Sequence, residues 1–216
     1  MLELFERLLH IGAPGNFEWI LENYQTSIYL LLFMIIFIET GLVIMPFLPG
    51  DSLLFVAGLF AGTGQLDLLT ILGLLFIAAV LGDGVNYFIG KHIGLKFVKI
   101  KLFGKRLVKD EHIKQTQEFY DKYGTKTIII ARFVPFVRTL APFLAGIGEM
   151  KYRTFLSYNV IGGAIWIFGV TLIGYFLGSN EWVKANLEKM ILGIIFISLI
   201  PIIVEFVKAR MSKKST

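Results

Sequence analysis

Cysteine is absent from this chain of 216 residues, and charged residues are scarce. The absence of thiols excludes a disulfide framework and a thiolate metal site. Charged residues make up only 17% of the sequence, whereas hydrophobic residues make up 56%. A soluble domain of this length does not need so much apolar sequence, and several windows reach the ~20 apolar residues that cross a bilayer. The composition therefore predicts an integral membrane protein.

A basic segment followed by a short apolar core is also missing from the N-terminus. The first 27 residues instead carry four glutamates, Glu3, Glu6, Glu18 and Glu22. We therefore expect no cleavable signal peptide. Apolar and acidic residues alternate here with helical spacing, which predicts an N-terminal interfacial segment over 1–27.

Proline is rare, with six residues in the chain, and it breaks two of the apolar stretches. A Pro-Gly-Asp run at 49–51 interrupts the stretch 28–62, and the piece after the break would be only roughly 16 Å long as a helix. That is about half the thickness of the hydrocarbon core. We therefore expect 28–62 to form a re-entrant hairpin. The stretch 127–148 is broken by Pro135 and Pro142 and is expected to form a second one.

Three further apolar stretches predict transmembrane helices over 66–90, 154–177 and 189–207. Between the first two, residues 91–126 hold ten Lys or Arg against four Asp or Glu, interleaved with apolar side chains. That pattern predicts an amphipathic segment on the membrane surface, although a solvated basic loop fits its second half equally well.

Two short motifs recur with the same offset of 88 residues. The sequence "FVAG" at 55–58 returns as "FLAG" at 143–146, and "YFIG" at 87–90 returns as "YFLG" at 175–178. Two matches at one offset indicate an internal duplication. Each half is a broken hairpin followed by one crossing, so the second copy must be inverted, as in many transporters.

The predicted fold is therefore an all-α integral membrane protein. It consists of an inverted repeat of two re-entrant hairpins, each followed by a transmembrane helix, with an interfacial amphipathic segment and a C-terminal transmembrane helix. We assign the membrane domain to 28–180, and the last span with a basic cytoplasmic tail to 189–216. The excess of Lys and Arg in 91–126 places that segment in the cytoplasm and the N-terminus outside. The alternative is a full crossing at 28–45 with the N-terminus inside.

Four ionisable residues lie within the predicted hairpins. Glu39 and Asp51 belong to the first, and Arg132 and Arg138 to the second. Charged residues at membrane depth face partners or water rather than lipid, and mark functional sites by default. We expect them to share a polar cavity, although four residues that merely hold the hairpins together would give the same pattern.

Two further polar residues have alternative interpretations. Asp83 is either a fifth member of this group or a residue near the end of a helix. Asn159 either bonds the broken backbone or makes a plain interhelical contact.

The combination of these residues resembles the DedA membrane proteins, which share the VTT (SNARE-associated) domain. It consists of Glu39, "PGD" at 49–51, "GD" at 82–83, "RFVPFVR" at 132–138 and Asn159. The resemblance covers roughly 28–180. It implies re-entrant hairpins and lipid movement across membranes, and bacterial members of the family are linked to undecaprenyl phosphate recycling and phosphatidylethanolamine scrambling. The acids essential in the family match Glu39 and Asp51, and its essential arginines match Arg132 and Arg138.

We therefore expect a multi-pass translocase in the bacterial plasma membrane that carries an anionic lipid headgroup, undecaprenyl phosphate above all. Arg132 and Arg138 would bind the lipid phosphate, and Glu39 and Asp51 would couple transport to protons. The expected partners are lipid and protons, with a homo-oligomer as an option and without nucleic acid. No catalytic residue, metal or cofactor is expected. Supporting positions are Pro49, Gly50, Gly82, Asp83, Pro135 and Asn159.

Other functions stay open at this point. A phospholipid scramblase and a proton-coupled exchanger of small ions or drugs would use the same acids. We do not expect an enzyme, because the three histidines, His10, His92 and His112, lie outside the predicted spans and no nucleophile motif is present.

Overall fold

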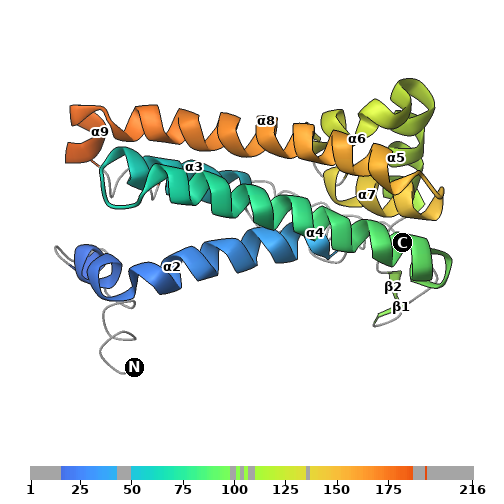
Figure 1. Ribbon diagram of the computed structural model, residues 1–216, viewed down its shortest axis with the longest axis horizontal. Coiled ribbons are helices and arrows are strands. Elements are labelled where there is room, and N and C mark those ends of the chain that lie inside the picture. Colours follow the sequence, from blue (N-terminus) through green and yellow to red (C-terminus); the bar gives the residue numbers. More distant parts are fainter. Residues whose placement is uncertain are drawn as a thin grey trace, which may run out of the picture. The chain divides into compact units, whose positions relative to one another are not determined.

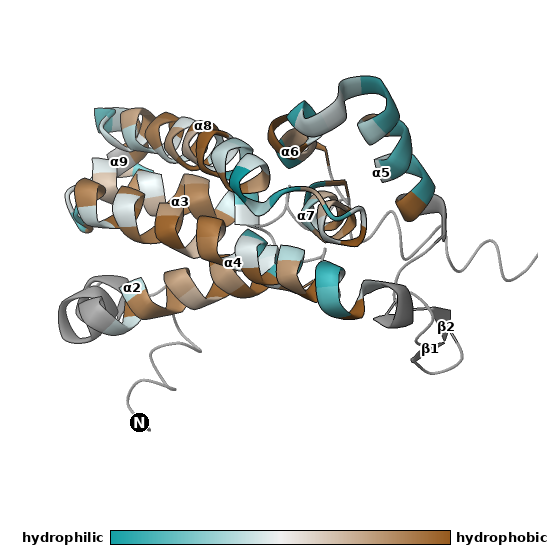
Figure 2. Cartoon of the chain, turned by 45° about the vertical axis from the view of Figure 1, so that its right-hand side comes forward, coloured by the Kyte–Doolittle hydropathy of each residue, from teal (hydrophilic) through white to brown (hydrophobic). Residues whose placement is uncertain are grey.

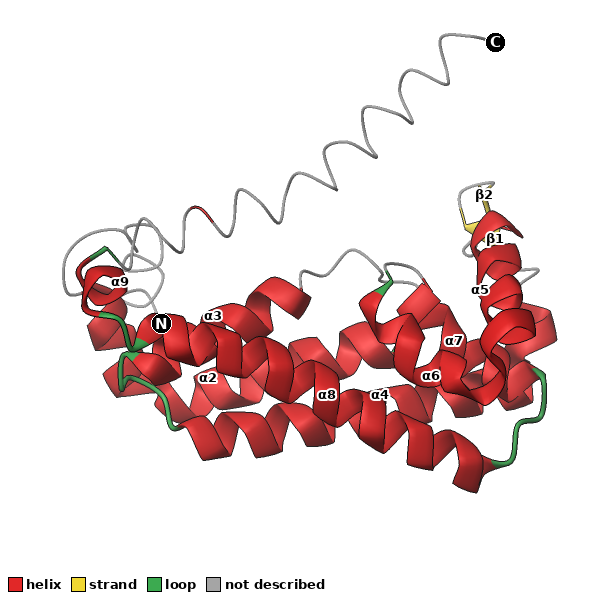
Figure 3. Cartoon of the chain, turned by 90° about the horizontal axis from the view of Figure 1, so that it is seen from above, coloured by secondary structure: helices red, strands yellow, loops and turns green. Residues whose placement is uncertain are grey.

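The computed structural model describes residues 16–42, 50–97, 101–102, 105–106, 110–134, 137–186 and 193. Helices make up almost all of the described chain (Figure 3). In chain order they are α2 (Asn16–Gly41), α3 (Gly50–Gly62), α4 (Leu68–Phe97), α5 (Asp110–Tyr123), the 3-10 helix η1 (Gly124–Lys126), α6 (Thr127–Ile130), the 3-10 helix η2 (Ala131–Phe133), α7 (Val137–Ile147), α8 (Tyr152–Gly178) and α9 (Glu181–Ala185).

Two helices of the described chain are long and apolar enough to cross a membrane. They are Leu68–Gly94 within α4 and Tyr152–Gly178, which is α8, and each has 27 residues. At 1.5 Å per residue each measures about 40 Å, more than the ~30 Å hydrocarbon core. Figure 2 shows both as largely hydrophobic along their length. The apolar helices predicted at 66–90 and 154–177 are confirmed, whereas the predicted span 189–207 lies outside the described residues apart from Gly193.

Three apolar helical stretches are shorter than these two helices. They are Ser27–Gly41 within α2, Gly50–Gly62 and Val137–Ile147. The 11 residues of α7 measure about 16 Å, which is too short to cross the hydrocarbon core. The second interruption falls where the sequence predicted it, because η2 ends in an extended residue, Val134, before α7 begins. Of the first predicted break, at 49–51, Pro49 lies outside the described residues, and α3 begins at Gly50.

Three features differ from the sequence predictions. First, α2 begins at Asn16 and runs through the boundary placed at 27, since nothing in that part of the sequence stops a helix. Second, Pro142 does not break the second hairpin but lies inside α7. A proline there removes one backbone hydrogen bond, which neighbouring groups in a membrane protein can replace.

Third, the basic segment contains a pair of strands that the sequence analysis did not predict. Two short strands, β1 (Lys101–Leu102) and β2 (Lys105–Arg106), pair antiparallel with Lys101 opposite Arg106. The helix α5 that follows is mostly hydrophilic (Figure 2). The hydroxyl of Tyr120 on its inner face donates to the carbonyl of Ala141 in α7 at 2.8 Å, and burial raises the pKa of this phenol.

The chain forms two compact units. One comprises 1–29, 51–68 and 170–216, and the other comprises 30–50 and 69–169. In the first unit, α3 packs so closely on the end of α8 that a Cβ on Gly58 would overlap the carbonyl of Thr171. In the second unit, α7 packs on the end of α4 in the same manner, and a Cβ on Gly146 would overlap the carbonyl of Tyr87 (Figure 1).

These contacts pair the repeated motifs crosswise. The helix that carries "FVAG" packs against the one that carries "YFLG", and "FLAG" packs against "YFIG". Glycine at both faces lets the backbones touch, which is typical of helix packing in membranes. The half-helix of each repeat therefore lies on the long helix of the other.

Candidate functional site

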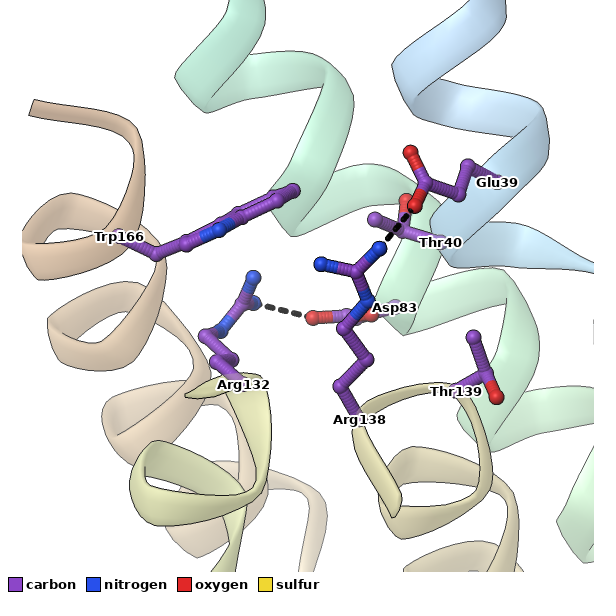
Figure 4. Close-up of a pocket in the computed structure, with 7 residues that line it drawn as sticks. All are labelled: Glu39, Thr40, Asp83, Arg132, Arg138, Thr139 and Trp166. Atoms are coloured by element: carbon purple, nitrogen blue, oxygen red, sulfur yellow. Dashed lines mark hydrogen bonds and ion pairs between the residues drawn. The ribbon is translucent and has the colours of Figure 1, made fainter. Parts of the chain in front are cut away.

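A buried polar cavity lies within the unit formed by 30–50 and 69–169 (Figure 4). Its walls come from the end of α2, the middle of α4, η2, the start of α7 and the middle of α8. The residues that line it are Glu39, Thr40, Asp83, Arg132, Arg138, Thr139 and Trp166.

One ion pair joins the end of α2 to the start of α7. The guanidinium of Arg138 donates to Glu39 Oε1 at 2.5 Å. The Glu39 side chain is only 1% exposed, whereas Arg138 is 17% exposed. Gly50, the glycine of the Pro-Gly-Asp run, lies so close to this carboxylate that a Cβ there would overlap its oxygens. The chain therefore needs glycine at this position for Glu39 to occupy its place.

A second ion pair joins η2 to α4. Arg132 donates to the carboxylate of Asp83 and to the side-chain oxygen of Asn159, and it is buried. The amide of Asn159 in turn donates to the carbonyl of Val80 at 3.1 Å. Asp83 is thus a member of the charged cluster, and Asn159 contacts both an arginine and the backbone.

The indole of Trp166 faces both arginines. The guanidinium carbon of Arg132 lies 5.7 Å from the ring centroid and that of Arg138 lies 5.5 Å from it. Both distances allow a cation–π interaction. Sequence reasoning missed Trp166, because a tryptophan on an apolar helix is usually a packing or lipid-facing residue.

Asn86 connects the end of α2 and the start of α7 to α4. Its side-chain amide donates to the carbonyl of Thr40 in α2 at 3.0 Å and to the carbonyl of Thr139 in α7 at 2.7 Å. Gly82, one turn earlier, lies against Thr40 without room for a Cβ. Sequence reasoning identified Gly82 but missed Asn86.

The other predicted site residues lie elsewhere. Asp51 is exposed in the first turn of α3 and is not among the residues that line the cavity. Pro49 and Pro135 lie outside the described residues. Within the described ranges, no group of three or more His, Cys, Asp or Glu side chains is arranged to hold a metal ion.

The charges in the cavity balance, with two guanidinium groups facing two carboxylates. Each charge placed at the centre of a membrane helix costs about 2.5–3.5 kcal/mol when it lacks a partner. The arginines stay charged, whereas a carboxylate can be neutralised by a proton. The site therefore brings two guanidinium groups and two carboxylates together in one cavity.

Comparison with known proteins adds a family. The VTT domain model matches residues 48–176. Protein DedA of Escherichia coli (strain K12) is 44% identical over 209 residues, which cover 96% of this chain and 94% of that protein. An uncharacterized membrane protein of Mycobacterium leprae is 44% identical over 171 residues, or 79% of this chain and 76% of that protein. Inner membrane protein YghB of E. coli is 34% identical over 175 residues, or 81% and 78%. No solved structure matches.

Proposed function

The chain belongs to the DedA family of membrane proteins, which share the VTT domain, and from that premise we propose that it is a translocase for an anionic lipid headgroup. It is a membrane protein, and YghB is named an inner membrane protein. We place this chain in the bacterial plasma membrane as well.

The observation that carries the proposal is the convergence of two guanidinium groups, one buried and one partly buried, on one cavity. A guanidinium presents parallel N–H donors that match a pair of phosphate oxygens and carries its charge at every physiological pH. A path for cations has no need of two fixed positive charges. In our proposal Arg132 and Arg138 bind the phosphate while the lipid tails stay in the bilayer.

The paired carboxylates support a coupling to protons. Arg138 is paired with Glu39 and Arg132 with Asp83, so a phosphate that binds the arginines must displace a carboxylate. Protonation of Glu39 would release its arginine to the incoming phosphate, and the proton would travel with the lipid. Asp51 lies at the start of the other half-helix and is proposed as a second proton-carrying residue.

The architecture we propose is the inverted repeat of two re-entrant hairpins. With 13 and 11 residues, α3 and α7 are each too short to cross the hydrocarbon core, which supports hairpins that do not cross the membrane. The crosswise packing of the repeated motifs supports a duplication. Irregular backbone next to Arg132 is tolerated at membrane depth where it lines a polar cavity.

Undecaprenyl phosphate is the lipid we propose, with phosphatidylethanolamine as the second candidate. The terminal phosphate monoester of undecaprenyl phosphate offers more negative oxygen to two guanidinium groups than the phosphodiester of phosphatidylethanolamine does. Its choice among lipids with a phosphate monoester comes from the family resemblance. We propose binding and movement rather than bond cleavage, because the cavity residues include neither His nor Cys as a nucleophile.

The test is transport of both lipids by the purified protein in liposomes. A soluble phosphatase added outside hydrolyses only outer-leaflet undecaprenyl phosphate, and an impermeant amine reagent labels only outer-leaflet phosphatidylethanolamine. We expect the protein to make the inner-leaflet undecaprenyl phosphate accessible to the phosphatase. If phosphatidylethanolamine alone becomes accessible, the protein is a phospholipid scramblase, and if neither does, it is not a lipid translocase.

A further inference from the structure

One face of α8 is shaped to receive Arg132. Residues three, four and seven positions apart lie on the same side of a helix, so Asn159, the pair Gly162–Gly163 and Trp166 form one continuous face. Asn159 accepts a hydrogen bond from the Arg132 guanidinium at one end of this face. The Trp166 ring meets the same guanidinium at the other end, as Figure 4 shows.

The two glycines leave room for the arginine to lie against the helix backbone. A Cβ on Gly162 would stand 3.2 Å from both Cδ and Nε of Arg132, which is tighter than ordinary packing. A Cβ on Gly163 would stand 3.5 Å from its Nη2. Any larger side chain at Gly162 would push the arginine away from the helix. The sequence "NVIGGAIW" at 159–166 thus forms a trough that fixes the direction of Arg132.

Trp166 joins this trough to the second arginine. Its side chain is almost entirely buried, and its ring lies 5.5 Å from the guanidinium carbon of Arg138 as well. Arg132 belongs to η2 and Arg138 to α7, so the two arginines are carried by different helices. Two like charges repel strongly where water is excluded, and each is also drawn toward its own carboxylate. The negative face of one indole attracts both and opposes their separation.

We propose that Trp166 is the positioning residue that holds the two guanidinium groups together as a single receptor for one phosphate monoester. This inference deepens the proposed function and rests on it. Without the ring, each arginine follows its own carboxylate, Arg132 toward Asp83 and Arg138 toward Glu39. A phosphate then meets one guanidinium at a time, and the preference for a monoester over a diester disappears with the second guanidinium.

The experiment measures binding of two single-chain phosphates to the full-length protein in detergent. The probes are dodecyl phosphate, a monoester, and dodecyl methyl phosphate, a diester with the same chain, and their dissociation constants are measured by calorimetry. The variants are Trp166→Leu, which removes the ring, and Trp166→Phe, which keeps a smaller one. Trp182→Leu is the control, because Trp182 is exposed in α9.

We expect the wild type, Trp166→Phe and the control to prefer the monoester. Trp166→Leu should bind the monoester about tenfold more weakly and lose the preference, since tenfold corresponds to about 1.4 kcal/mol, a magnitude typical of a partly desolvated cation–π contact. Trp166→Phe should weaken binding by only about threefold, because phenylalanine keeps an aromatic face. If Trp166→Leu does not fold, Trp166→Phe is compared with Trp166→Met, and only the aromatic variant should keep the preference.

Two results overturn the inference in different ways. If the wild type binds the monoester, and the non-aromatic variants keep both its affinity and its preference, Trp166 does not position the arginines and the proposed function stands. If the wild type binds neither phosphate, there is no receptor to position, and the proposed function falls as well.

Discussion

Glu39 is the buried partner of the more accessible arginine, and its carboxylate is the group we propose to take up a proton. Replacing Glu39 by Gln keeps the shape of the side chain and removes its titration. We expect the pH dependence of lipid transport to flatten in liposomes. We also expect the free energy of unfolding to fall by about 3 kcal/mol, the lower end for breaking a buried pair, because Arg138 is 17% exposed.

Asp51→Asn is the companion to Glu39→Gln, because Asp51 is exposed and its replacement should leave the melting temperature nearly unchanged. A pH profile of Glu39→Gln that matches the wild type would contradict a role in proton coupling. If Glu39→Gln fails to accumulate in the membrane, the ion pair serves the fold rather than transport.

Arg132 and Arg138 are expected to need the guanidinium and not merely a charge. Lysine keeps the charge but presents a compact ammonium without the planar fork. Arg132→Lys and Arg138→Lys should each slow the transport of lipid phosphate by about tenfold or more, which is a loss of about 1.4 kcal/mol or more. Expression should persist in both.

The matched control for both arginine variants is Arg153→Lys, because Arg153 is exposed in the first turn of α8 and does not line the cavity. Transport at the wild-type rate by either cavity variant would mean that the guanidinium fork is not used.

At the scale of single residues, the sequence predicted the charged members of the cavity better than the uncharged ones. Glu39, Arg132 and Arg138 stand out because each places a charge inside an apolar stretch. The role of Asp83 was ambiguous, because the position of a residue along a predicted helix does not show how deep in the membrane it lies. Trp166 and Asn86 were missed, since an indole or an amide on a long helix has many ordinary uses. The run "NVIGGAIW" was the available signal, since paired glycines one turn before a tryptophan leave space for a large neighbour.

At the scale of elements, the contact of α7 with α4 depends on the absence of side chains. A Cβ on Gly90 would overlap the carbonyl of Phe143, so Gly90→Ala must push the helices apart. We expect it to lower the free energy of unfolding by about 1–3 kcal/mol, the usual range for overpacking. Thermal unfolding in detergent measures the change.

Gly73→Ala is the control within the same helix, since a Cβ at Gly73 meets nothing within 4 Å. It should be neutral or more stable by up to about 1 kcal/mol, because alanine favours a helix over glycine. Equal losses in Gly73→Ala and Gly90→Ala would show that helix propensity and not close packing is responsible.

The contact between α2, α4 and α7 depends on Asn86. Asn86→Ala removes the two hydrogen bonds to the carbonyls of Thr40 and Thr139, each worth about 1 kcal/mol. We expect the free energy of unfolding to fall by about 2 kcal/mol. We also expect weaker binding of dodecyl phosphate, because α2 carries Glu39 and α7 carries Arg138.

Asn180→Ala, which removes the exposed cap of α9, should cost stability without changing phosphate binding. If Asn86→Ala binds dodecyl phosphate as the wild type does, the hydrogen bonds of Asn86 do not contribute to phosphate binding in the cavity.

The approximate lengths of the helices were predictable, because apolar runs mark helices that can lie in the membrane and prolines mark where such a run can be broken. Val134, which precedes Pro135 in the sequence, is extended, as expected of a residue before proline. Pro142, in contrast, lies inside α7, because neighbouring groups can replace the missing hydrogen bond. The strand pair at 101–106 was not predictable, since two residues on each side leave no pattern of alternation.

At the scale of the whole molecule, the lack of cysteine makes the proposed topology open to a clean test. In that topology α6 and α7 enter from the cytoplasm and return, so Lys126 and Lys151, which flank them, lie on the same side. Both are exposed, as are Asp67 before α4 and Ser179 after α8. Single cysteines at these four positions have no background thiol to compete with the label.

We expect a membrane-impermeant maleimide to label Asp67→Cys and Ser179→Cys on intact cells, and Lys126→Cys and Lys151→Cys only in inside-out vesicles. The reason is that α4 and α8 are each long and apolar enough to cross once, while α7 at about 16 Å is too short. Labelling of Lys126→Cys and Lys151→Cys from opposite sides would mean that this hairpin crosses. Labelling of Asp67→Cys and Lys126→Cys from the same side would mean that α4 does not. Either result removes the inverted repeat, because that architecture requires one crossing per copy and a hairpin that returns to the side from which it entered.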